Sequence, residues 1–303
     1  MDGEPIFEVT TIPFRELPLS NDFLFGEVMR KPEICRLFLE ALLGKPIARV
    51  EYVLKQKDIS DSYWSRGIRL DVYLNDDAGT VYNIEMEARA TTVLPKRSRY
   101  YQGTIDRHHL GRGEWYATLP DSYIIFVCAF DPFGRGLALY KRKMLIEGYK
   151  DSENDIKVED FEYQDGSHLY YLNSACKTEN ADSAILEFLR CIRSNNINAE
   201  DYATPLMKAV CPAIDEIRHD SQKEAEYMTL QMKMMEIREE GREEGREEGR
   251  KEGEANGAAK GKAEVVMEML RDNAPLSLIE KYTQVSAEKI AEIARSIGMS
   301  PVT

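Results

Sequence analysis

The sequence predicts an α/β domain followed by an all-helical tail. Three observations carry this prediction: short segments in which apolar and polar residues alternate, amphipathic helical segments among them, and a final third without any strand pattern. We expect the α/β domain over residues 20–195, after an N-terminal extension at 1–19. The tail divides into a helical segment at 196–262 and a small helical bundle at 263–303.

Two helices open the domain, and three strands follow. Ser20 is the expected N-cap of the first helix, Pro32 starts the second, and Gly44 ends it. The turn sequence Asn75–Gly79, with a glycine placed for positive φ, joins the last two strands into a hairpin. The strands are expected where residues alternate with period two, at Val50–Leu54, Ile68–Leu74 and Tyr82–Met86.

The second half of the domain is expected to begin with a helix from Pro95 to about Leu110. The segment Ser122–Phe130 is apolar almost throughout, which predicts a strand buried on both faces at the centre of a sheet. The remaining expected elements are a strand at Leu137–Tyr140, a second hairpin formed by Val158–Tyr163 and His168–Leu172 across Gln164–Gly166, and a capped helix at Asp182–Arg193.

The composition excludes several classes of protein. The 53 acidic and 40 basic residues give a net charge of −13, which excludes a uniformly basic nucleic-acid coat but not a local basic face. Five cysteines without a CxxC pair make a zinc knuckle or a disulfide framework unexpected. We find no signal peptide and no apolar run of the ~20 residues that a membrane span needs. We therefore expect a cytoplasmic protein without membrane contact.

The first hairpin brings acidic side chains together. It is symmetric about Ala78, so paired residue numbers sum to about 156, and Asp71 stands opposite Glu85 with Cβ atoms ~5 Å apart. Glu87 shares the face of Glu85. Carboxylates this close repel unless they are protonated or bind a divalent cation, and oxygen ligands without histidine favour Mg²⁺ or Mn²⁺. Such an ion could activate a water against a phosphodiester. The alternative is a solvent-exposed acidic sheet face.

This arrangement resembles the Asp…(Asp/Glu)-x-Lys signature of the PD-(D/E)xK nucleases. Longer stretches resemble one branch, the Rpn family of recombination-promoting nucleases, whose members are also described as PD-(D/E)xK transposases. The matching stretches are PLSNDFLFGEVM, RLDVYLNDDAGTVYNIEMEAR, PKRSRYYQGTIDRHHLGRGEWY, SYIIFVCAFDPFGRGLALY and the EYM…REEGREEGREEG tail. The resemblance implies a restriction-endonuclease-like mixed-sheet core and Mg²⁺-dependent DNA cleavage linked to recombination or transposition.

The resemblance also implies roles for individual residues. Asp71 and Glu85 would be the catalytic, metal-binding acids. The family has Lys or Gln where this chain has Glu87, and an ionised glutamate cannot donate a hydrogen bond to the attacking water. Glu87 could ligate a second metal, or it could mark a weakened site. Asp22 matches a further metal-binding acid of the first helix, with Glu27 as the competitor, although an acid in a first turn also complements the helix dipole.

The helix from Pro95 is rich in positive charge. We expect Lys96, Arg97 and Arg99 to bind DNA phosphates, unless they pair with the surplus of acidic residues.

The tail carries a glycine at every fourth position from Gly241 to Gly261. Each glycine costs a helix ~1 kcal/mol relative to alanine, but a glycine stripe permits close helix–helix approach. The repeat therefore has two alternative roles: it forms a homo-oligomer through the tail, or it is a solvated spacer between the two domains. The C-terminal bundle could be a helix-turn-helix, but its acidic character favours protein contacts.

Three functions remain after these arguments. The first is a divalent-metal-dependent DNA endonuclease. The second is a catalytically weakened nuclease-fold protein that binds DNA or a protein partner without cutting. The third is a helical scaffold that acts through assembly of the tail.

Overall fold

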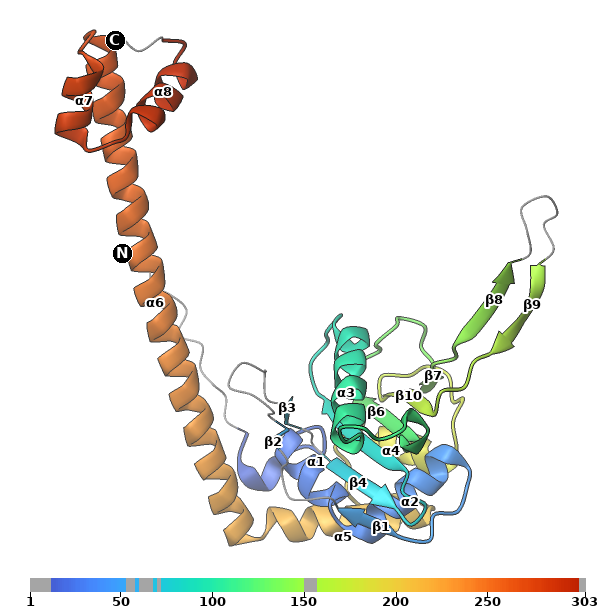
Figure 1. Ribbon diagram of the computed structural model, residues 1–303. Helices are drawn as coiled ribbons and strands as arrows, with labels where there is room; N and C mark the ends of the chain where they lie inside the picture. The colour runs from blue at the N-terminus through green and yellow to red at the C-terminus, as the bar shows by residue number, and fades with distance from the viewer. Residues whose placement is uncertain (1–11, 53–57, 60–67, 70–71, 150–156, 300–303) are drawn as a thin grey trace. The chain divides into compact units, whose positions relative to one another are not determined.

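The structure is a computed structural model that describes residues 12–52, 58–59, 68–69, 72–149 and 157–299 (Figure 1). The chain forms two compact units, Met1–Tyr227 and Met228–Thr303. Each unit is described below by itself.

The first unit is built on a six-stranded mixed sheet with the strand order β1-β4-β5-β6-β10-β7. The central strand β6 is parallel to β5 and β10, and the outer pairs are antiparallel. All seven residues of β6 are buried, which confirms the central strand expected from its apolar sequence. The strands are β1 (Val50–Tyr52), β4 (Val72–Asp76), β5 (Val81–Glu87), β6 (Ser122–Cys128), β7 (Leu139–Lys141) and β10 (Ser167–Asn173).

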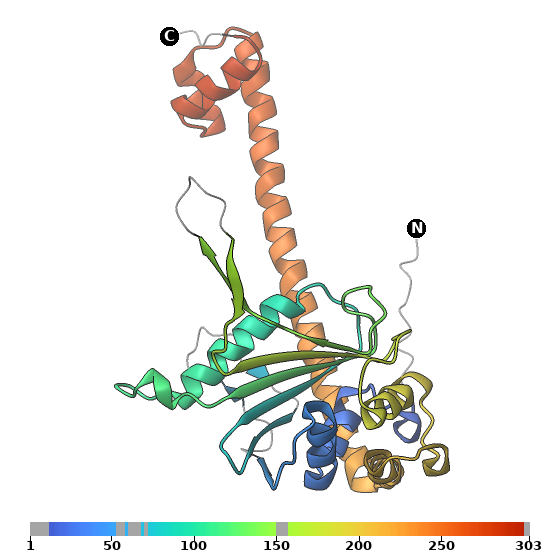
Figure 2. The same ribbon diagram turned by 90° about the vertical axis from the view of Figure 1, so that its right-hand side faces the viewer.

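Helices cover both faces of this sheet (Figure 2). One face packs against four helices: α1 (Asp22–Met29), α2 (Pro32–Leu43), α4 (Ser183–Ser194) and α5 (Pro205–Arg218). The other face packs against α3 (Leu94–His109) through Leu94, Tyr101 and Ile105. The expected α/β class with a helical tail is therefore confirmed.

The helix ends follow the local sequence with one difference. The N-cap of α1 is Asn21, not Ser20, because the Asn21 carboxamide oxygen accepts hydrogen bonds from the backbone N–H groups of Phe23 and Leu24. Gly44 ends α2 in the left-handed region, as expected. Asp182 caps α4 by accepting from the N–H of Ala184 at 2.8 Å, also as expected.

The β4–β5 hairpin has the predicted register. Val72 pairs with Ile84 and Leu74 with Tyr82, so the paired numbers sum to 156. Gly79 has φ +82° in the turn. The strand expected at Ile68–Leu74 is described in two pieces: β3 (Ile68–Arg69), which pairs with β2 (Asp58–Ile59), and β4.

The predicted second hairpin is wrong. The segment expected as its first strand forms β9 (Lys157–Glu162), which pairs with β8 (Leu145–Tyr149), whereas β10 joins the main sheet beside β6. Gly166 does turn the chain with φ +78°, but the turn connects two different sheets. The apolar sequence of β10 explains why this strand joins the main sheet, because a strand of this kind needs cover on both faces.

The α5 helix is part of the core of this unit. Its buried residues Leu206, Val210 and Ile214 belong to the same apolar cluster as the sheet. Arg218, also buried, donates from Nε to the carbonyl oxygen of Leu17 at 3.0 Å and from Nη2 to Asn195 Oδ1 at 2.9 Å. This arginine ties two segments that lie 201 residues apart in the chain.

The second unit consists of the greater part of α6 (Ser221–Arg271), with α7 (Leu276–Thr283) and α8 (Ala287–Ser296). The six glycines of the repeat do not interrupt α6, and a Cβ added at any of them would meet nothing within 4 Å. The three helices enclose a small core of Val266, Leu270, Ile279, Ile290 and Ala294. Among the described residues, no helix combines the length and the apolar composition that crossing a membrane requires.

Candidate active site

The acidic residues of β5 lie beneath α3. Alternation along the strand directs Tyr82, Ile84 and Met86 into the larger core, so Glu85 and Glu87 face the opposite side. The two glutamates are only 3% and 8% exposed. The solvent-exposed acidic face that the sequence left open is therefore wrong for these two residues. Buried carboxylates need a nearby cation or hydrogen-bond donors.

Arg97, in the first turns of α3, supplies that cation. Its Nη1 lies 2.5 Å from Glu87 Oε1, and its Nη2 lies 3.6 Å from Glu85 Oε2. The guanidinium therefore bridges the two carboxylates. The Arg97 side chain remains 34% exposed, so the bridge can be reached from solvent.

Two aromatic rings hold the guanidinium in place. Arg97 Nη2 donates to the Tyr101 hydroxyl at 2.8 Å, and the Arg97 Cζ atom lies 5.4 Å from the ring centroid of Tyr101 and 5.8 Å from that of Phe126. The Tyr101 hydroxyl in turn donates to Glu85 Oε2 at 3.4 Å. Burial and the neighbouring Glu85 charge raise the pKa of Tyr101 to about 12, so this hydroxyl keeps its proton at neutral pH.

The folded protein disfavours the ionised form of Glu87. Burial raises the pKa of Glu87, the Arg97 guanidinium lowers it, and the negative charge of Asp22 raises it again. Burial is the largest of these effects, and the pKa lies above the ordinary value. The influence of Asp22 on Glu87 brings the first residue of α1 into the electrostatics of the site. The competitor Glu27 instead pairs with Arg30 at 2.5 Å and with Lys223 at 2.9 Å.

Asp71 lies outside the described residues. The observed hairpin register ends with the pair Val72–Ile84, immediately before the position at which the sequence sets Asp71 opposite Glu85. Within the described part of the chain, no group of three His, Cys, Asp or Glu side chains is arranged to hold a metal ion. The described donors, two glutamate carboxylates, suit a hard divalent cation in kind but do not complete its ligand set.

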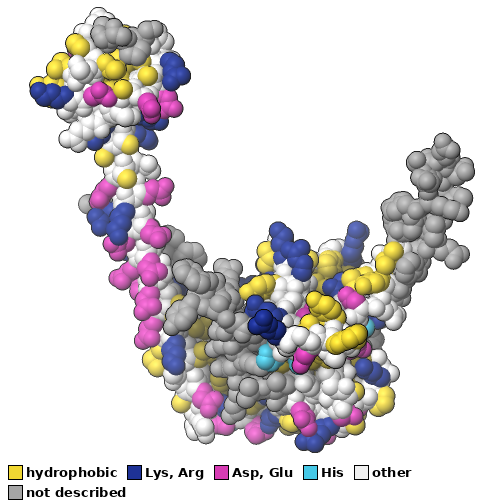
Figure 3. Space-filling model, viewed as in Figure 1, with side chains coloured by type: hydrophobic (Ala, Val, Ile, Leu, Met, Phe, Trp, Pro, Cys, Tyr) yellow, Lys and Arg dark blue, Asp and Glu magenta, His cyan; other side chains and the backbone are white. Residues whose placement is uncertain are grey.

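The three basic residues expected to bind DNA differ in orientation. Lys96 and Arg99 are exposed on the outer side of α3. Arg97, between them, points inward to the glutamates. In Figure 3, Lys and Arg side chains gather over α3.

Sequence reasoning missed three neighbours of the acids. Tyr101 and Phe126 hold Arg97, and only Tyr101 had a local signal, because residues four apart on a helix touch. Asn83 precedes Glu85 by two residues on the same face of β5 and is fully buried. Neither amide atom of Asn83 has a hydrogen-bond partner in the described structure. A buried amide of this kind is satisfied most simply by an internal water.

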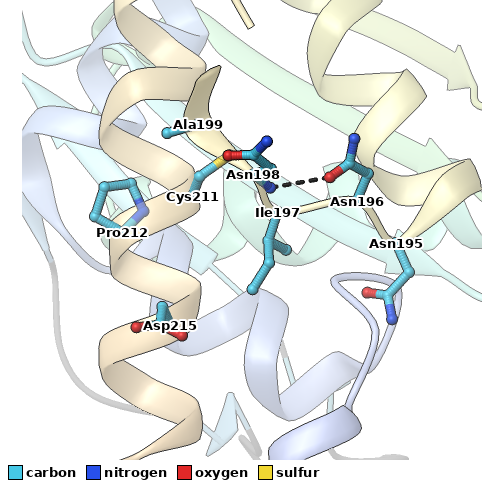
Figure 4. A pocket seen from close by; sticks show the side chains of 8 residues that line it. All are labelled: Asn195, Asn196, Ile197, Asn198, Ala199, Cys211, Pro212 and Asp215. Carbon is cyan, nitrogen blue, oxygen red and sulfur yellow. Dashed lines mark hydrogen bonds between the residues drawn. The ribbon is translucent and has the colours of Figure 1, made fainter. Parts of the chain in front are cut away.

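A separate pocket lies among the C-terminal end of α4, η3 (Ala199–Asp201) and α5 (Figure 4). It shares no residue with the acidic site. The only sulfur atom in the described pocket lining is Cys211 Sγ. Burial raises the pKa of this thiol to about 12, so the thiol is protonated and unreactive at neutral pH. Asp215 is the one acidic residue among the described residues that line the pocket, and no basic side chain lies among them to form an acid–base pair. It is lined by Asn195, Asn196, Ile197, Asn198, Ala199, Cys211, Pro212 and Asp215.

Residues 20–236 match the family described as PD-(D/E)XK nuclease family transposase, which indicates a nuclease-related function. No curated protein and no solved structure matches the chain. The family match spans more than two thirds of the sequence and includes β5, α3 and the Glu85–Arg97–Glu87 bridge.

Proposed function

Because the chain belongs to the family of PD-(D/E)XK nuclease transposases, we propose that it is a divalent-metal-dependent DNA endonuclease that acts in recombination or transposition. The observation that carries the proposal is the pair of buried glutamates, Glu85 and Glu87, which a single guanidinium bridges where the family motif falls. Burying two carboxylates side by side is costly. Cation binding is the chemistry that carboxylates held this close together suit best.

Divalent metals are generally used by nucleases of this family, and the oxygen donors favour Mg²⁺ or Mn²⁺ over zinc. In this proposal Glu85 and Asp22 would hold the ion together with Asp71, which the sequence predicts to stand opposite Glu85. When bound, the ion would polarise the scissile phosphodiester and lower the pKa of a water.

The chain's own residues have further roles in the proposal. Glu87 stands where the family has Lys or Gln, and when it is ionised it cannot stabilise negative charge by donating a hydrogen bond. Arg97 contacts Glu87 directly and brings two N–H donor groups to that position. We assign to Arg97 the cationic role that the motif residue lacks: it would orient a phosphate oxygen or the attacking water. Tyr101 stays protonated and keeps Glu85 oriented through its hydroxyl.

The 2.5 Å contact between Arg97 and Glu87 favours a second candidate function. If this ion pair persists in the presence of metal, it closes the site. The protein would then bind DNA without cutting it, as a catalytically weakened member of the family.

Nicking of supercoiled plasmid by the purified full-length chain separates the two functions. We expect nicking that requires Mg²⁺ or Mn²⁺, is lost in Glu85→Gln, and is retained in Glu33→Gln, a matched control at an exposed acid of α2. No nicking with any divalent metal, together with retained DNA binding, would establish the second function. Nicking that survives Glu85→Gln would remove the site assignment.

A further inference from the structure

The loop that follows α3 displays two aromatic side chains to solvent. Trp115 is 81% exposed and Tyr116 is 82% exposed, the two highest values among the exposed large hydrophobic residues of the described chain. The short helix η2 (Tyr116–Thr118) lies in this loop, which projects beyond the sheet at the left of Figure 2. Large aromatic rings are seldom left this open unless they meet a ligand or a partner.

The loop has a defined local structure. Glu114 Oε2 accepts a hydrogen bond from the N–H of Gly111 at 2.7 Å, and Thr118 Oγ1 donates to the carbonyl oxygen of Trp115 at 2.7 Å. Gly113 adopts φ +88°, which only glycine takes without strain. These contacts fix the backbone that presents the two rings. The exposed aromatics therefore sit on an ordered support.

A basic stripe on α3 leads to this loop. Lys96, Arg99, Tyr100 and Arg107 are all exposed, and their spacing of three, four and eleven residues places them on one side of the helix. Gly103 lies within the stripe, and a Cβ there would meet nothing within 4 Å, so no side chain interrupts the surface. The opposite side of α3 is the one buried on the sheet.

We propose that Trp115 and Tyr116 stack on unpaired bases of DNA while the cations of α3 hold its phosphates, so that the substrate is DNA with single-stranded or unstacked bases. This inference rests on the proposed function and names its substrate class. Proteins that bind single strands combine a positively charged track with aromatic rings on which bases stack. An intact duplex keeps its bases paired and offers the rings nothing to stack on.

The position of α3 connects the platform to the acidic site. The helix has 16 residues and is therefore ~24 Å long. Its first turns carry Arg97, which contacts both glutamates, and its last turn leads to Trp115. A strand laid along the outer stripe would follow the ~24 Å of the helix from the turn that carries Arg97 to the loop that carries the rings.

Intrinsic fluorescence provides the direct test. The chain has two tryptophans, so Trp64→Phe leaves Trp115 as the sole tryptophan. In EDTA, where cleavage is absent, oligothymidine of about 15 nucleotides should quench Trp115 fluorescence. A duplex of equal length should not. In the otherwise wild-type chain, fluorescence anisotropy of labelled oligothymidine should show affinity about tenfold weaker for Trp115→Ala and for Tyr116→Ala, and unchanged for Tyr282→Ala, an exposed aromatic of α7.

Equal affinity for oligothymidine and duplex, or Ala variants that bind like wild type, would overturn the inference. So would a changed sedimentation coefficient in Trp115→Ala, because the rings would then contact a second copy of the chain. The two proposals fail separately. Metal-dependent nicking without a single-strand preference removes only the stacking platform, and quenching by oligothymidine without nicking in any metal removes only the endonuclease.

Discussion

Replacement of Arg97 by methionine tests whether the guanidinium holds two buried negative charges together. Arg97→Met keeps a long side chain between Tyr101 and Phe126 but removes the charge. The variant should be less stable than wild type at pH 8. The loss should shrink as the pH is lowered, because protonation of Glu87 removes one of the two charges left without their cation.

The magnitude follows from the contacts. Arg97 lies 2.5 Å from Glu87 and 3.6 Å from Glu85. At an effective dielectric constant of ~20, each of these two charge pairs attracts by roughly 5 to 7 kcal/mol before desolvation is subtracted. Removing one partner of a fully buried pair costs about 3–5 kcal/mol. Because a third of the Arg97 side chain is exposed, screening reduces this figure, and we expect a loss of about 2 kcal/mol. In a domain of this size that lowers the Tm by about 4–8 °C.

The sign of the pH dependence comes from Glu87. Burial raises its pKa in the folded state, so its contribution to stability is complete below the unfolded value and is lost as the pH rises through the folded value. Loss of Arg97 removes a lowering influence and raises this pKa further. The gap in Tm between wild type and Arg97→Met should therefore be largest near pH 8 and smallest near pH 4.

Thermal unfolding of the full-length chain, followed by circular dichroism from pH 4 to pH 8, measures this gap. Arg99→Met is the matched control, since Arg99 is exposed on the same helix, and it should change stability by less than ~0.5 kcal/mol. Mg²⁺ should raise the Tm of Arg97→Met more than that of wild type if a cation can replace the guanidinium. A gap that is equal at pH 4 and pH 8 would refute the electrostatic reasoning and assign Arg97 a packing role.

Three further outcomes are expected. Glu87→Gln should nick DNA faster at neutral pH. Because burial raises the Glu87 pKa, the variant should also unfold at a higher temperature than wild type at pH 8 but not at pH 4. Slower nicking would identify Glu87 as a working ligand. A chain ending at Asn195 lacks α5 and should show no cooperative melting transition, whereas one ending at Tyr227 should melt cooperatively; equal melting curves would contradict the role of α5 in the core. The full-length chain should sediment as a dimer or larger species at micromolar concentration, because the exposed methionines and glycines of α6 offer a contact surface. The chain ending at Tyr227 should sediment as a monomer. A monomeric full-length chain would leave the repeat as a spacer.

Local patterns predicted the hairpin at the centre of the site. The turn sequence Asn75–Gly79 and the alternation on either side fixed its register, because a slip by one residue would expose Ile84 and Met86. The same reasoning failed at Gln164–Gly166, where the turn signal was correct but its flanking strands have different partners. A turn specifies a change of direction, and long-range burial decides the pairing.

The helix over the site was predicted in extent but not in orientation. Its start was expected at Pro95 and lies at Leu94. The inward direction of Arg97 depends on how α3 is rotated on the sheet, which is determined by the burial of Leu94, Tyr101 and Ile105. Three adjacent cations therefore look alike in the sequence, although one of them bridges the glutamates and its neighbours face solvent.

The contact between Arg218 and Leu17 has a consequence for synthesis of the chain. The core cannot close on the ribosome until α5 has been translated, because residues at both ends of the first unit pack together. The 76 residues after Tyr227 take roughly 4 to 15 s to translate at 5–20 residues per second. Translation of the second unit thus gives the long-range contacts of the first unit time to form while the nascent chain is still tethered.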